Sequence, residues 1–311
     1  MNKFLTKTVI LLCVLFVLNV ILDYGITRFL NHSELHMYKP WNHIINDTLE
    51  ADLLVMGSSR AQRQYDTRIM DSMLLLNTYN LGLRASHVNR QIVIYKVYRH
   101  YQRKKPSFLL VNFDYWGNWV GSNYEREQFF PYLANPFVRR LVLKHEHFVM
   151  RELYLPMYRY YSQGLLSLMD KDDTARFSPK NWYKGYWGYS LGWDGEEIKK
   201  VEKIEFKTNA SIVEDFDAFL SELQKDGVKV IFVSSPICAM ATKKLVNPSE
   251  FYEFRDRFSE KYNIPVLDYI DDAICNDTTY FSNATHLNRA GAELFTTKLC
   301  QDLDSLGLLR L

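Results

Sequence analysis

The chain has 311 residues, of which 47% are apolar and 24% are charged, and its formal net charge is +2. This composition allows one large buried core and excludes a disordered or fibrous protein. The nearly neutral charge, without a stripe of Lys and Arg interleaved with aromatic residues, argues against a nucleic-acid partner. We therefore expect one globular domain with appended segments.

Residues 1–30 predict a membrane anchor. An apolar run extends over residues 9–22, broken only by Asn19, and Lys3 and Lys7 precede it. Counted from Phe4, the run approaches the ~20 residues that cross a bilayer. The alternatives are a cleaved signal peptide, although the run ends without the small residues of a cleavage site, and a buried soluble helix. The positive-inside tendency predicts a single-pass protein of the cell membrane whose remainder is extracytoplasmic, either periplasmic or extracellular.

The rest of the chain alternates between strands and helices. Residues 31–50 are expected to form a linker, and residues 51–311 a domain. The predicted strands are 51–56, 76–80, 108–112, 228–234 and 265–268. A helical stretch follows the first strand and ends near 73, and the later predicted helices are 86–102, 211–225, 248–262 and 288–306. This order predicts an α/β fold, a five-stranded parallel doubly wound sheet, whose ligands bind beyond the carboxyl ends of the strands.

The alternation is lost between about residues 115 and 208, which we interpret as an aromatic-rich insertion. It is expected to be partly helical over 137–168 and rich in loops over 181–194. Its aromatic residues could form a lid or packing layer over the sheet. Alternatively, they could line a groove for sugar rings or acyl chains, because aromatic faces are flat and apolar with a polar edge.

Three short segments lie where strands end. Ser59, in Gly57-Ser58-Ser59-Arg60, follows the first strand and begins a helix, so its hydroxyl lies beside amides that can stabilise negative charge. His286 follows the last strand and is expected at the same edge, where it could accept the proton of Ser59. Gly82 follows the second strand, and its amide could join that of Ser59 in an oxyanion hole, or the segment could be an ordinary turn.

These segments, in this order, resemble the SGNH (GDSL-like) hydrolase superfamily, and more closely its membrane-anchored extracytoplasmic branch. That branch includes proteins like the D-alanyl transfer protein of lipoteichoic acid and alginate-type O-acetyltransferases. The resemblance covers about residues 50–118 and 209–307. It implies an SGNH/flavodoxin-like sheet, with Ser59 as the nucleophile, Gly82 as the second-block glycine and His286 as the closing histidine.

Two positions depart from the family pattern. Where the family usually has Asp three residues before His, this chain has Asn283, which could orient the imidazole but cannot stabilise its cation by charge. Asp277 is an alternative acid. For the oxyanion-hole Asn of the third block, Asn118 is the candidate and Asn112 the second choice.

Cofactor and metal sites are not expected. The sequence contains neither a dinucleotide fingerprint nor a Walker loop, and its His residues lack metal-ligand spacing. Cys13 lies in the apolar run; a Cys238–Cys275 bridge and three buried free thiols, including Cys300, are both compatible with the sequence.

The predicted function is a serine-dependent acyl ester hydrolase (esterase) or O-acyltransferase. The resemblance implies that it modifies a cell-envelope or exported polysaccharide, with acetyl as the default acyl group, and that a membrane acyl-donor protein could be a partner. Hydrolysis and transfer share the first half-reaction, so the residues do not separate them. The alternative is a non-catalytic envelope protein that binds glycan or assists assembly, for which Ser59 and His286 would be misplaced or mutating Ser59 would leave the function intact.

Overall fold

The computed structural model describes residues 2–115, 118–121, 125–162, 181–193, 195–199, 201 and 203–310. Its contacts divide the chain into two compact units. We call the described parts of 1–43 and 123–175 the N-terminal unit, and those of 44–122 and 176–311 the sheet unit.

The sheet unit contains the predicted sheet of five parallel strands. The strands are β1 (Leu53–Met56), β2 (Thr78–Asn80), β3 (Phe108–Asn112), β6 (Lys229–Ser234) and β7 (Val266–Asp268), in the order β2-β1-β3-β6-β7. All four residues of β1 are fully buried, which explains why this strand is a continuous apolar run. The prediction of an α/β fold with a five-stranded parallel sheet is confirmed.

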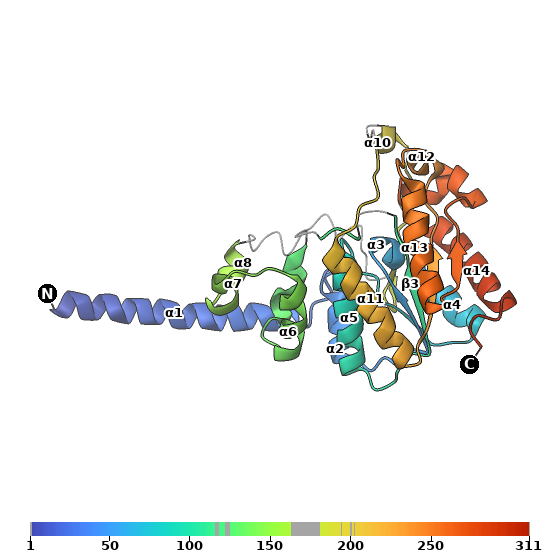
Figure 1. Ribbon diagram of the computed structural model, residues 1–311. Helices are drawn as coiled ribbons and strands as arrows, with labels where there is room; N and C mark the ends of the chain where they lie inside the picture. The colour runs from blue at the N-terminus through green and yellow to red at the C-terminus, as the bar shows by residue number, and fades with distance from the viewer. Residues whose placement is uncertain are drawn as a thin grey trace. The chain divides into compact units, whose positions relative to one another are not determined.

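Helices cover both faces of this sheet (Figure 1). One layer contains α5 (Val88–Tyr101), α11 (Ala210–Lys225) and α13 (Pro248–Tyr262), and the other contains α3 (Ser59–Gln64), α4 (Thr67–Leu74) and α14 (Arg289–Ser305). The other described helices of this unit are short: α10 (Glu196–Lys199), α12 (Ala239–Thr242), η4 (Ala273–Asn276) and η5 (Thr278–Tyr280). Two antiparallel strand pairs complete its described elements. In the first, β4 (Trp182–Tyr183) pairs with β5 (Tyr186–Trp187), and in the second, β8 (Phe281–Asn283) pairs with β9 (His286–Leu287).

The helical stretch predicted after β1 consists of two helices. The chain leaves the helical conformation at Tyr65, and Asp66 then caps α4 by accepting a hydrogen bond from the Arg68 amide at 3.0 Å. A capping carboxylate inside an apparently continuous pattern ends one helix and begins the next. The stretch is helical as predicted, and the apolar periodicity, which passes across the break, does not reveal it.

The N-terminal unit contains a long apolar helix and four short ones. Its elements are α1 (Asn2–Leu30), η1 (Arg126–Tyr132), α6 (Pro136–His145), α7 (Met150–Tyr154) and α8 (Tyr158–Ser162). Among the described residues, α1 is the one helix long and apolar enough to cross a membrane, over residues 3–30.

Residues 31–50, which the sequence predicts as a linker, contain a short helix. Most of this segment is ordered around α2 (Lys39–Asn46), and the Trp41 side chain is buried against Phe129 and Tyr132 of η1. Asn42 donates hydrogen bonds to the carbonyl of Leu30, the last residue of α1, at 2.8 Å and to the carbonyl of Ser33, in the turn that follows, at 3.0 Å. The buried ring and the cap hold the segment in place.

The described residues of the predicted insertion are divided between the two units. Helices α6, α7 and α8 occur where a partly helical segment was expected, and residues 163–168 lie outside the described residues. In the sheet unit, the β4–β5 hairpin buries Tyr186 and Trp187, and its Lys184 carbonyl accepts the Asn80 amide at 2.9 Å beyond β2. These two aromatic residues therefore form a packing layer, while a sugar or acyl groove stays a prediction.

Candidate active site

Ser59 is held at the carboxyl edge of the sheet by a tight strand-to-helix turn. β1 ends at Met56 and α3 begins at Ser59, so the Ser59 amide is one of the first-turn amides, which have no acceptor within the helix. Gly57 allows the turn, because a Cβ there would lie 2.6 Å from the Ala61 Cβ and 2.9 Å from the Asn112 Cβ. The small residue thus lets α3 start close to β3.

The structure brings Ser59 and His286 together, although 227 positions separate them in the chain. The Ser59 Oγ lies 2.8 Å from the His286 Nε2. His286 begins β9, and this short strand pairs with β8 and packs against α3. A nucleophile and a base within hydrogen-bond distance form the arrangement that activates a serine hydroxyl.

Asn283 orients the imidazole on its other side. Its Oδ1 lies 2.9 Å from the His286 Nδ1 and accepts hydrogen bonds from the amides of Thr285 and His286, each at 3.0 Å. These two backbone donors require an oxygen at this position, which fixes the orientation of the side-chain amide. Because a carbonyl oxygen can only accept, Nδ1 carries the proton and Nε2 is left free to accept the hydroxyl proton of Ser59.

The alternative acid, Asp277, has another role. Its Oδ1 accepts hydrogen bonds from the amide and hydroxyl of Thr279, at 2.9 and 2.6 Å, and so caps η5. The neighbours of the His286 Nδ1 are instead Asn283 and the Thr285 Oγ1, the latter at 3.0 Å. Of the two orienting groups considered from the sequence, the geometry selects Asn283.

The environment of His286 is desolvated and positively charged. The pKa of His286 lies well below its ordinary value, mainly because the ring is buried. The positive charges of Arg63, Arg60 and Arg84 lower this pKa further. A lowered pKa keeps the imidazole neutral at pH 7 and therefore able to accept a proton. A carboxylate at position 283 would oppose this effect, and the amide does not.

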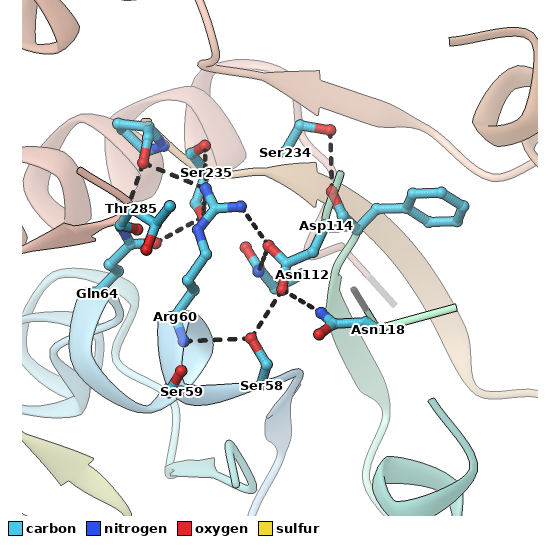
Figure 2. A network of polar contacts seen from close by, with 12 residues as sticks. Ser58, Ser59, Arg60, Gln64, Asn112, Asp114, Asn118, Ser234, Ser235 and Thr285 are labelled. Atoms are coloured by element: carbon cyan, nitrogen blue, oxygen red, sulfur yellow. Dashed lines mark hydrogen bonds and ion pairs between the residues drawn. The ribbon is translucent and has the colours of Figure 1, made fainter. Parts of the chain in front are cut away.

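A buried polar network lies beneath the turn (Figure 2). Asp114, which is 1% exposed, follows β3, and its carboxylate accepts four hydrogen bonds. The donors are Arg60 Nη1 at 2.5 Å, Asn112 Nδ2 at 2.5 Å, Ser58 Oγ at 2.9 Å and Asn118 Nδ2 at 2.6 Å. Four donors match the acceptor sites of an ionised carboxylate, so the buried charge is fully satisfied.

Two side chains of α3 connect this network to the loops that follow β6 and β8. The Arg60 Nη2 donates to the Ser235 carbonyl at 2.7 Å and to the Ser235 Oγ at 2.9 Å. Gln64, which is fully buried, donates to the carbonyls of Pro236 and Thr285 at 3.2 and 3.3 Å. Gln64 thereby links the helix that begins at Ser59 to the residue before His286 and acts as a positioning residue.

The sequence did not predict roles for Arg60, Gln64, Asp114 or Ser235. The one available signal was that two ionisable residues, Arg60 and Asp114, lie within four residues of the ends of two buried, mostly apolar strands, β1 and β3. Charges in such places are almost never fully buried unless they are paired.

The predicted partners of Ser59 in an oxyanion hole have other acceptors. The Gly82 amide donates to the Asn80 Oδ1 at 2.8 Å, and a Cβ on Gly82 would lie 2.3 Å from the Gln62 backbone nitrogen. The absence of a side chain at Gly82 therefore allows its loop to lie close to α3. Asn118 donates to Asp114, and so does Asn112, whose Oδ1 also accepts from the Tyr65 hydroxyl at 2.6 Å. In this structure the Gly82 amide and the Asn118 side chain donate to these other acceptors, so their place in an oxyanion hole with the Ser59 amide stays a prediction.

The cysteines and the candidate metal ligands form no further centre. Within the described ranges, Cys238, Cys275 and Cys300 are buried free thiols, so the Cys238–Cys275 bridge is not formed. No group of three or more His, Cys, Asp or Glu side chains in the described part of the chain could hold a metal ion.

Replacing Asn283 with Asp should change the pH dependence of any activity that uses His286 as a base. A carboxylate beside Nδ1 stabilises the imidazolium, so the pKa of His286 should rise from its lowered value. Because the neutral imidazole is the active form, the acid limb of the pH–rate profile should move to higher pH. Above that limb, the rate should increase, because the cation that forms in the transition state is stabilised.

The measurement is the rate of ester cleavage between pH 4 and 9 for the native chain, Asn283→Asp and the control Asp277→Asn. The control removes a carboxylate that caps η5 and should leave the limb unchanged. An acid limb that stays in place or moves to lower pH in Asn283→Asp would contradict the assignment of His286 as the base.

Comparison with known proteins gives likenesses of fold. The chain matches no family model and no curated protein. Among solved structures, it is similar to a protein assigned to the G-D-S-L lipolytic family from Desulfitobacterium hafniense DCB-2, with 11% identity and a TM-score of 0.40, over 80% of this chain and 97% of that one. The lipase/acylhydrolase from Enterococcus faecalis matches with 10% identity and a TM-score of 0.38, over 82% of this chain and 95% of its own. At these identities and TM-scores, the likenesses do not establish membership of a family.

Proposed function

We propose that this chain is a serine-dependent acyl ester hydrolase or O-acyltransferase. The observation that carries the proposal is the contact of 2.8 Å between the Ser59 Oγ and the His286 Nε2, with the Nδ1 of the same ring held by Asn283. This arrangement supplies a nucleophile, a base and an orienting acceptor in series.

In the first half-reaction, the Ser59 Oγ bonds to the acyl carbon while its proton passes to the His286 Nε2. When the tetrahedral intermediate collapses, the bond to the leaving alkoxide breaks and His286 returns the proton to that oxygen. The acyl group is then an ester of Ser59. In the second half-reaction, His286 takes a proton from water or from a sugar hydroxyl, whose oxygen attacks the acyl carbon. The bond between this carbon and the Ser59 Oγ then breaks, and His286 returns the proton to the Ser59 Oγ.

The charge on the tetrahedral intermediate has support from the surroundings of Ser59. The Ser59 amide lies at the start of α3 and can donate to the oxyanion. The guanidinium groups of Arg60, Arg63 and Arg84 act on His286 electrostatically, and the same positive charges favour a negative oxygen beside Ser59. A second amide donor would require a change in the hydrogen bond between Gly82 and Asn80.

We further propose that α1 anchors the chain in the cell membrane, with the sheet unit outside the cytoplasm. Its apolar segment has a mean hydropathy of 2.5, and Lys3 and Lys7 precede the apolar run. This placement and the resemblance to membrane-anchored SGNH proteins support a cell-envelope or exported polysaccharide as the substrate. They also support acetyl as the acyl group and a membrane acyl-donor protein as a partner.

The rival interpretation is a non-catalytic envelope protein that binds glycan or assists assembly. It predicts either that Ser59 and His286 are misplaced or that mutating Ser59 leaves the function intact. The contact of 2.8 Å between Ser59 and His286 does not favour the first of these, and the Ser59→Ala variant tests the second.

The proposal is tested by the release of p-nitrophenol from p-nitrophenyl acetate by the full chain in detergent. Release well above the buffer rate, with a burst that reports an acyl-enzyme, is expected. An added oligosaccharide that captures the acetyl group would identify a transferase, whereas capture by water alone would identify an esterase. Release at the buffer rate would count against the serine mechanism.

A further inference from the structure

The surface of α7 in the N-terminal unit is unusually apolar for residues outside the expected membrane span. Met150 is 70% exposed, Tyr154 is 65% exposed and Leu155 is 48% exposed. We call residues 149–155 the α7 ledge. Exposed apolar residues that occur together mark an interaction surface more often than a solvated one.

The basic and the acidic side chain of the α7 ledge differ in their exposure to solvent. Its basic residue, Arg151, is exposed. Its acid, Glu152, is 2% exposed and is neutralised by an ion pair with Arg126 and a hydrogen bond from the Val149 amide at 3.0 Å. The exposed side chains of the ledge are therefore apolar, aromatic or cationic, which is the composition that suits the headgroup layer of a bilayer with anionic lipids.

The ledge lies beside the part of α1 where the apolar run ends. From Phe4 to Leu22, a helix rises about 27 Å, which nearly spans a hydrocarbon core of about 30 Å. The next residue, Asp23, accepts hydrogen bonds from the Met157 amide at 2.8 Å and from the Arg159 Nη2 at 2.6 Å. The chain that directly follows the ledge is thus fixed at the depth where the hydrocarbon core should end.

A pocket of about 250 Å³ confirms that the two segments are neighbours within this unit. One wall of the pocket is formed by α1, with Val20 and Tyr24 among its residues, and the opposite wall includes Tyr154 and Leu155 of the ledge. Figure 1 shows α7 and α8 alongside α1. The ledge and the end of the apolar run therefore face the same environment.

We propose that the α7 ledge is a membrane-contact surface that lies in the headgroup layer of the bilayer that α1 spans. Tyr154 and Leu155 insert at the boundary of the hydrocarbon core, and Arg151 faces the lipid phosphates. The proposal rests on the membrane insertion of α1 proposed above and is independent of the serine chemistry. Its occupant is the lipid surface itself, so it requires no protein partner.

The test uses the full chain in vesicles of phosphatidylcholine and phosphatidylglycerol, with an environment-sensitive fluorophore on a single reactive cysteine. Two variants, Leu155→Cys and Tyr154→Cys, place the probe on the ledge in a Cys13→Ser background. Native Cys13, which is exposed in the middle of the apolar run, provides a deep reference. Ser305→Cys, at the exposed end of α14, provides a water reference in the same background.

Emission from the ledge probes should be shifted to shorter wavelength than that of the Ser305→Cys probe. Nitroxide groups near the headgroups should quench the ledge probes more than nitroxides deep in the acyl chains, and the Cys13 probe should show the opposite order. If Cys13 reports lipid while both ledge probes match the water reference, the ledge does not contact the membrane. If the Cys13 probe also reports water, α1 is not inserted in the membrane and the proposed contact of the ledge is overturned as well. This result would not bear on the serine chemistry, which the esterase assay tests separately.

Discussion

Replacing Ser59 with Ala, or His286 with Ala, is expected to lower the rate of acyl release by roughly a thousandfold or more. The Ser59 Oγ is the atom that would form the acyl ester, and the His286 Nε2 at 2.8 Å is the base nearest to it. Because both residues act in one step, the double variant should be scarcely slower than either single variant. The measurement is the steady-state rate with p-nitrophenyl acetate, together with the thermal midpoint of each variant.

The adjacent serine provides a matched control. Ser58→Ala removes a hydroxyl of the same type, but this hydroxyl donates to Asp114 and caps α3. Its loss should cost about 1 kcal/mol of stability and change the rate by about tenfold or less. If Ser58→Ala abolished activity while Ser59→Ala retained it, the assignment of the nucleophile would be wrong.

Replacing Asp114 with Asn is expected to destabilise the fold by about 3 to 5 kcal/mol, because it leaves the buried guanidinium of Arg60 without its counter-charge. The two side chains are 1% and 4% exposed, and the carboxylate accepts four hydrogen bonds that a single amide oxygen cannot replace. Activity should fall as well, since Arg60 directly follows Ser59. The measurement is the denaturant midpoint of the full chain in detergent, followed by near-ultraviolet circular dichroism.

Asp217→Asn makes the same chemical change in an exposed ion pair. Asp217 pairs with Lys261 at 2.7 Å on the surface, where solvent screens the charges, so this variant should unfold almost as the native chain does. Equal denaturant midpoints for the Asp114 and Asp217 variants would show that the buried ion pair contributes no more to stability than the exposed one. Adding Arg60→Met to Asp114→Asn should recover part of the loss, because it removes the unpaired charge.

The parts of the site that the sequence could predict are those set by topology. Parallel strands end at one edge, so residues that follow strands, such as Ser59 and His286, can be expected to meet there. Asn283 could be proposed as the orienter because it lies three residues before His286 in the same turn. Each of these inferences needs the order of elements and not the details of packing.

The parts that could not be predicted depend on contacts between distant side chains. Whether the Gly82 amide is available depends on Asn80, whose side chain also donates to the Ala61 carbonyl at 2.8 Å. Whether Asn118 is available depends on the buried carboxylate of Asp114, which no local pattern reveals as an acceptor. Likewise, no pattern in residues 31–50 predicts that Trp41 contacts Gln128 and Phe129 of η1, more than eighty positions away in the chain.

The buried free thiols have a consequence for the chemical reactivity of the sheet unit. Burial raises the pKa of Cys275 to about 11 and that of Cys300 to about 12, and it also raises the pKa of Cys238. Because the thiolate is the species that attacks a disulfide or an oxidant, the folded sheet unit should be inert to both. Its folding requires no disulfide exchange, and an alkylating reagent should reach these three sulfur atoms only after the sheet unit has unfolded.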